Sequence, residues 1–131
     1  MANNNNNDSR ASKRLRWIAR VLGSLVAAFW LFVCIGSGMS NPNPLTWEDA
    51  IMAGLITTSV IGVLVAWKRE LTGGIIILVC AIAHITFAYL VAGHNKGFAM
   101  LISGGPLLLV GTLFLASWWR SRRSMVSQNG G

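Results

Sequence analysis

Charged residues are scarce in this chain of 131 residues, because only 11% are Asp, Glu, Lys or Arg, whereas 53% are hydrophobic. Soluble domains carry about a quarter charged residues. A water-soluble globule of this composition would have to expose apolar patches larger than soluble monomers tolerate. The shortage of charge therefore argues against a soluble domain and favours an integral membrane protein.

Acidic residues are the rarest charged class, with 4 Asp and Glu against 11 Lys and Arg. Such a balance raises nucleic acid as a partner, but the distribution favours lipid. Ten of the eleven basic residues form three clusters beside apolar runs: Arg10 to Arg20, Lys68 with Arg69, and Arg120 to Arg123. Clusters in such places set membrane topology and attract anionic head groups. We expect the lipid bilayer, with its anionic head groups at the cytoplasmic face, as a partner, and no nucleic acid.

Cysteine is also rare, and Cys34 and Cys80 both fall inside apolar runs. This placement suggests neither a disulfide framework nor a zinc site. The chain has no phosphate-binding loop, nucleophile elbow or paired catalytic carboxylates. We therefore expect no enzyme, with no catalytic, cofactor-binding or metal-binding residue.

Four apolar runs have about the length of 20 residues that a helix needs to cross a bilayer. They cover residues 17–35, 47–67, 71–92 and 98–119. Pro42 and Pro44 interrupt the chain after the first run, and Thr46 is placed to cap the second helix. Short polar turns at 67–70 and 93–97 make consecutive spans antiparallel neighbours. The sequence predicts an all-α membrane protein built as a four-helix bundle.

The tails flank this transmembrane domain, which we place at residues 16–120. Residues 1–15 are rich in asparagine and are predicted to be a disordered tail, and residues 121–131 a basic flexible tail. All the basic residues except Lys96 lie in or close to the tails and the second loop. The positive-inside rule thus predicts both termini in the cytoplasm and a multi-pass protein of the cell (inner or plasma) membrane. Four tryptophans at the same predicted interface agree: Trp17, Trp67, Trp118 and Trp119.

The first apolar run has a second interpretation, because a basic start and the small residues Gly36, Ser37 and Gly38 also fit a cleaved signal peptide. Its apolar stretch is longer than the usual 7–15 residues. Cleavage would also move the basic second loop outside. A retained span is the favoured interpretation.

Small residues recur at every fourth position of the second span and form one ridge: Ala50, Gly54, Thr58, Gly62 and Ala66. Such a ridge lets a neighbouring backbone approach closely, which is how helices in lipid gain packing energy. The ridge is either an oligomer interface or, as we favour, a packing face inside the bundle.

His84 lies near the middle of the third span, where an ionisable group is costly and often functional. Cys80 lies one turn away, and Ser103 of the fourth span is a further candidate for the same intramembrane polar site. A proton relay, haem ligation or copper binding would need additional ligands or carboxylates that the spans lack. We favour a neutral histidine that is hydrogen-bonded across helices.

Glu70, beside Lys68 and Arg69, either fixes the hairpin turn or contacts basic residues of the tails.

The fourth span contains Gly104, Gly105 and Pro106, which predict a helix kink. Interrupted helices in transporters expose backbone groups to substrate, so this kink is the main indication of a transport site. Most prolines in membrane helices are only kinks, and no other span carries a matching interruption.

Two segments carry a resemblance to a known family, namely Trp67–Gly74 (WKRELTGG) and Gly105–Trp119 (GPLLLVGTLFLASWW). They resemble a family of small prokaryotic four-helix membrane proteins known as a domain of unknown function, over about residues 45–120. The resemblance implies fold and location but no catalytic residue. The leading hypothesis is a structural or interaction protein that associates with itself or a membrane partner through small-residue helix faces. The alternative is a minimal oligomeric transporter or channel for a small solute.

Overall fold

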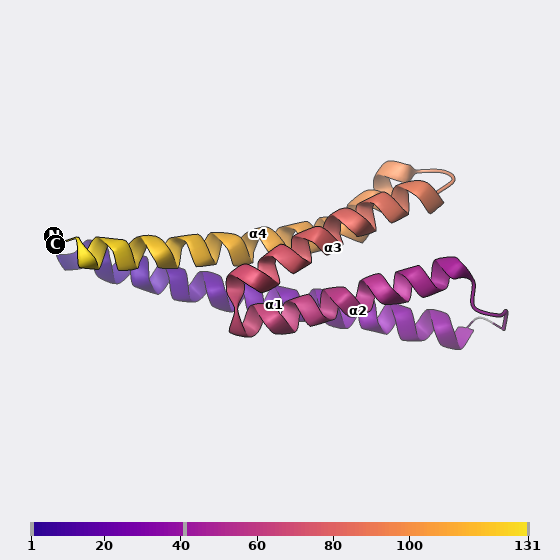
Figure 1. Ribbon diagram of the computed structural model, residues 1–131, viewed down its shortest axis with the longest axis horizontal. Coiled ribbons are helices and arrows are strands. Elements are labelled where there is room, and N and C mark those ends of the chain that lie inside the picture. Colours follow the sequence, from indigo (N-terminus) through magenta and orange to yellow (C-terminus); the bar gives the residue numbers. More distant parts are fainter. Residues whose placement is uncertain (1, 41, 131) are drawn as a thin grey trace.

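Four long helices make up the computed structural model, which describes residues 2–40 and 42–130. They are α1 (Ala2–Ser40), α2 (Trp47–Lys68), α3 (Glu70–Val91) and α4 (Lys96–Asn129) (Figure 1). Each is long and apolar enough to cross a membrane. The prediction of an all-α protein with four membrane-length helices is therefore confirmed.

The ends of α2 follow from local chemistry. Thr46 caps its start, because the Asp49 amide donates to Thr46 Oγ1 at 3.3 Å and the Thr46 amide donates to Asp49 Oδ2 at 3.0 Å. This reciprocal capping box confirms the predicted cap. At the other end a single extended residue, Arg69, separates α2 from α3. The short turn makes α2 and α3 direct neighbours.

The outer helices are longer than their predicted spans. The sequence predicted a disordered tail at 1–15, a first span that ends at residue 35 and a flexible tail at 121–131, whereas α1 runs from Ala2 to Ser40 and α4 continues to Asn129. Extending an existing helix costs much less than starting one, so polar residues of modest propensity continue the spans. The parts of these predictions that fall on Met1, Asn41 and Gly131 lie outside the described residues.

The approach between helices is closest at two glycines. A Cβ on Gly73 of α3 would overlap the backbone of Ala66 in α2, and a Cβ on Gly104 of α4 would overlap the Ile85 side chain of α3. Contacts run between α3 and α4, α2 and α3, α1 and α4, and α1 and α2. Between them lies a small core of buried apolar side chains: Ala19, Val63, Ala66, Ile77, Ala81, Leu107, Val110 and Phe114.

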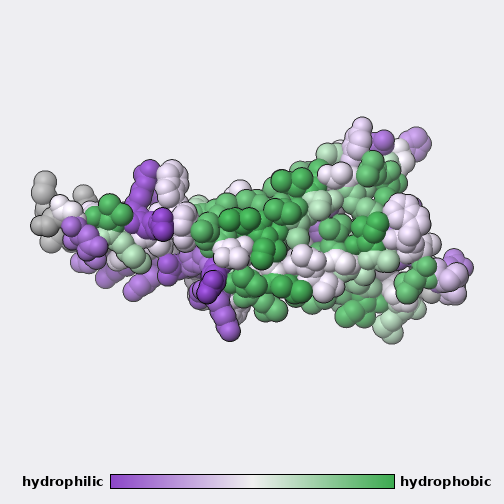
Figure 2. All heavy atoms as spheres, viewed as in Figure 1, coloured by the Kyte–Doolittle hydropathy of each residue, from purple (hydrophilic) through white to green (hydrophobic). Residues whose placement is uncertain are grey.

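Much of the apolar surface faces outward. Figure 2 shows a broad hydrophobic region over the middle of the molecule, with hydrophilic residues gathered toward the end that holds the termini and at the opposite tips. Phe32 is 77% exposed and Leu90 is 73% exposed. An exposed apolar surface of this extent is stable in hydrocarbon rather than in water. The protein is accordingly described as a multi-pass membrane protein.

Two of the three connections between helices lie at the end opposite the termini. In Figure 1 both termini lie together at one end, while the α1–α2 and α3–α4 connections lie at the other. The turn at Arg69 faces the end with the termini, and from there α2 and α3 diverge. The basic clusters of the sequence are thereby gathered in one half of the molecule.

Candidate functional site

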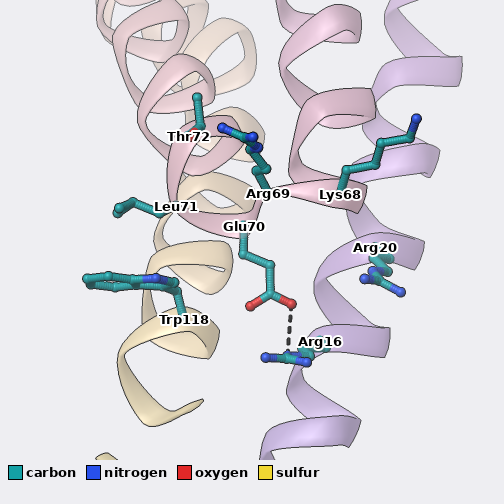
Figure 3. Close-up of a pocket in the computed structure, with 8 residues that line it drawn as sticks. All are labelled: Arg16, Arg20, Lys68, Arg69, Glu70, Leu71, Thr72 and Trp118. Carbon is teal, nitrogen blue, oxygen red and sulfur yellow. Dashed lines mark ion pairs between the residues drawn. The ribbon is translucent and has the colours of Figure 1, made fainter. Parts of the chain in front are cut away.

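The strongest polar cluster forms where α3 begins. Glu70, the first residue of α3, accepts a hydrogen bond from Ser117 Oγ of α4 at 3.0 Å. Its Oε1 lies 2.8 Å from Arg16 Nε of α1, an ion pair in which the N–H is not aligned for a hydrogen bond (Figure 3). A single carboxylate thus connects three helices.

Two arginines of α1 extend this cluster. Arg16 Nη2 donates to Ser121 Oγ of α4 at 2.7 Å, and Ser121 in turn donates to the carbonyl of Ser117 at 3.0 Å. Arg20 Nη2 donates to the carbonyl of Trp67 at 2.9 Å, at the end of α2. We call the group Arg16, Arg20, Glu70, Ser117 and Ser121 the polar cluster. It ties all four helices together at one level.

Partial burial strengthens the ion pair at the centre of the polar cluster. The side chain of Glu70 is 10% exposed and that of Arg16 is 41% exposed. Exposed pairs contribute little, while fully buried charges cost much to leave unpaired. The Arg16–Glu70 pair lies between these limits, and the Ser117 hydroxyl gives the carboxylate a second partner. The arrangement suits a structural clamp.

A cavity of about 410 Å³ opens beside the clamp. We call it the basic cavity, and Figure 3 shows the residues that line it: Arg16, Arg20, Lys68, Arg69, Glu70, Leu71, Thr72 and Trp118. Among the described residues that line the cavity, four are basic and one is acidic. Because Glu70 is already paired with Arg16, the cavity carries surplus positive charge. Chemically it is suited to an anion.

A second polar group lies around His84, which is completely buried. His84 Nδ1 is 2.8 Å from the carbonyl of Cys80, so Nδ1 is the protonated donor and Nε2 the free acceptor. Ser103 Oγ donates to the backbone carbonyl of His84 at 3.4 Å. The three predicted residues are therefore neighbours, and both hydrogen bonds end on backbone carbonyls. The imidazole bond lies within α3 rather than across helices as predicted, and the Cys80 thiol takes part in neither bond. The ring of Trp30 lies 5.8 Å from the His84 ring, centroid to centroid.

Comparison with known families decides where this chain belongs. The model of one family, described as a domain of unknown function (DUF7670), matches residues 7–126. The chain belongs to this family. The comparisons with curated proteins and with solved structures each give no match. The DUF7670 match confirms the resemblance to a domain of unknown function and extends it from residues 45–120 to residues 7–126, which adds most of α1.

The small-residue ridge of this DUF7670 chain is divided along its length. Gly62 and Ala66 are buried against α3, where a Cβ on Gly62 would lie 2.9 Å from Ile76 Cγ2. Ala50, Gly54 and Thr58 are exposed, and no atom lies within 4 Å of a Cβ built on Gly54. One half of the ridge therefore packs inside the chain, and the other half has no partner among the described residues.

The residues of the predicted kink lie within a continuous helix, because α4 runs through Pro106 without interruption. Gly104 is buried against α3, Gly105 is half-buried, and Pro106 is exposed. No group of three or more His, Cys, Asp or Glu side chains placed to hold a metal occurs in the part of the chain that the structure describes. The broken backbone typical of a transport site does not occur at Pro106.

The predicted interface anchors lie beside basic side chains. Trp17, Trp67 and Trp119 are exposed and Trp118 is half-buried. Arginine side chains lie over three of these rings, with guanidinium-to-ring distances of 4.3–5.9 Å: Arg20 over Trp67, Arg122 over Trp118 and Arg123 over Trp119. Such pairs hold the arginines at the level of the anchors.

Sequence reasoning missed Ser117, Ser121 and Trp30. The two serines are four residues apart and so share one helix face, which was a usable signal once α4 was known to extend beyond residue 119. Contact between Glu70 and basic residues of the tails was one of two interpretations of the sequence, and the choice of Arg16 depends on how α1 crosses α3. Trp30 carried no local signal, since it is one of several large apolar residues in its span.

Proposed function

We propose that this DUF7670 protein is a structural or interaction protein of the cell membrane that associates with a second copy of itself through α2. The observation that carries the proposal is the exposed half of the small-residue ridge, formed by Ala50, Gly54 and Thr58. A Cβ on Gly54 meets open space, so another helix can approach the backbone there. The buried half of the same ridge already packs in this way against α3.

We further propose that neighbouring helices run antiparallel, with both termini in the cytoplasm. The basic clusters support this orientation, because the turn between α2 and α3 that carries one of them faces the end with the termini (Figure 1). The anchor tryptophans support it too, since arginines of these clusters lie over three of their rings. A role without enzymatic activity and without a cofactor goes with the proposal. The transporter alternative stays a prediction, and the unbroken course of α4 does not favour it.

Replacing Gly54 by Leu tests the association face. We expect the dimer dissociation constant to rise about 10-fold or more, because the added side chain holds the two α2 backbones apart. Native mass spectrometry of the detergent-purified chain measures the size of the oligomer. Gly62 is unsuitable for this test, since a larger side chain there would disturb α3 instead.

Gly36→Leu is the matched control, because Gly36 is also helical and exposed and has no atom within 4 Å of its Cβ, but lies off the ridge. Its oligomer should have the wild-type size. An unchanged size in Gly54→Leu, or an equal shift in both variants, would refute the proposed face.

A further inference from the structure

The basic cavity carries positive charge that its own residues do not neutralise. Glu70 is paired with Arg16 and Ser117, which leaves Arg20, Lys68 and Arg69 without a carboxylate among the described residues that line the cavity. Arg20 uses one donor on the Trp67 carbonyl, out of the five N–H groups that a guanidinium offers. Lys68 and Arg69 are exposed at the turn. The free donors fit a phosphate group.

An apolar groove adjoins this cavity and points to the kind of molecule that carries the phosphate. The groove measures about 480 Å³ and is lined by Thr112, Leu115, Ala116, Trp118 and Trp119 of α4. Trp118 lines both the groove and the basic cavity, so the two spaces are neighbours. A basic cavity and an apolar groove that share the Trp118 side chain match an amphiphile rather than a free ion.

We infer that the basic cavity and the apolar groove together bind one anionic phospholipid. Its phosphate lies among Arg20, Lys68 and Arg69, and an acyl chain lies along Leu115 and Ala116. The location supports this occupant, because the cavity lies between membrane-length helices where the anchor tryptophans mark the interface. The site differs from the association face on α2 and does not depend on it.

Titration of the detergent-purified full-length chain with lipid tests the inference by native mass spectrometry. Dioleoyl phosphatidylglycerol should bind one copy with higher affinity than dioleoyl phosphatidylcholine, which has the same chains but no net charge. In Lys68→Gln/Arg69→Gln the dissociation constant of the first phosphatidylglycerol should rise about 30-fold, the value expected for two basic contacts. Both positions are exposed, so the variant should retain the wild-type helix content.

Lys13→Gln/Arg14→Gln is the matched control, because it removes the same two residue types from exposed positions of α1 that do not line the cavity. Its affinity should change less than about 3-fold. An equal loss in both variants would overturn the inference, because it would show diffuse attraction between a basic protein and an anionic lipid.

The groove has a test of its own. Ala116→Phe fills it from an exposed position and should weaken binding of the dioleoyl lipid, while added glycerol phosphate should not displace the lipid at equal concentration. Displacement by glycerol phosphate, or unchanged affinity in Ala116→Phe, would overturn the assignment of a lipid and leave a site for a free phosphate.

Discussion

Replacing Glu70 by Leu lowers the free energy of unfolding by about 2–3 kcal/mol, because it leaves Arg16 and Ser117 without their shared partner. Loss of an exposed pair costs less than about 1 kcal/mol and loss of a buried pair about 3–5 kcal/mol. The expected value lies between these limits because Glu70 is nearly buried while Arg16 is partly exposed. Circular dichroism of the detergent-purified protein, followed during denaturation, measures the change.

Glu48→Leu is the control for this prediction. Glu48 is half-buried at the start of α2, and its carboxylate forms no ion pair among the described residues. Its replacement should cost less than about 1 kcal/mol. A double-mutant cycle with Arg16→Met isolates the pair, and we expect Glu70→Leu to cost much less when Arg16 is already absent. Equal costs in both backgrounds would refute a clamp built on this ion pair.

Replacing Gly73 by Ala has a comparable effect, about 3 kcal/mol, for a steric reason. The new Cβ would overlap the backbone of Ala66, and backbone atoms cannot rotate away as a flexible side chain does. Relief requires α2 and α3 to separate next to their one-residue connection. Thermal unfolding in detergent should therefore begin at a clearly lower temperature than for the wild type.

Gly36→Ala supplies the matched comparison, since it adds the same methyl group to a helical glycine that has no atom within 4 Å of its Cβ and lies off the proposed association face. Stability should be unchanged or higher by up to about 1 kcal/mol, because alanine favours a helix more than glycine does. If Gly73→Ala were as stable as Gly36→Ala, the close packing of α2 on α3 would be wrong.

The helices were predictable from hydropathy, and their ends only in part. The bounds of α2 and α3 agree with the predicted spans within one residue, because Thr46, Arg69 and the polar residues after Val91 are local stop and start signals. The ends of α1 and α4 that lie toward the chain termini have no such signals. Composition indicated where α1 and α4 leave the hydrocarbon, but not that the helical backbone continues to Ala2 and Asn129.

The candidate site was predictable at the level of residue types. Periodicity placed five small residues on one face of α2, but it carries no information about the divergence of α2 and α3, which divides that face between Thr58 and Gly62. Likewise, Glu70 was recognisable as an unusual acidic residue in a basic turn. Its partners Arg16 and Ser117 lie 54 and 47 positions away in sequence, so only the tertiary structure identifies them.

Reporter fusions at four positions test the central claim, which is that four helices cross the bilayer with the basic clusters on the cytoplasmic side. Fusions at Arg69 and Ser127 should give a cytoplasmic signal, and fusions at Asn43 and Asn95 should give a signal from the opposite face. A signal from the outer face at Arg69 or Ser127 would contradict the topology and, with it, the proposed function.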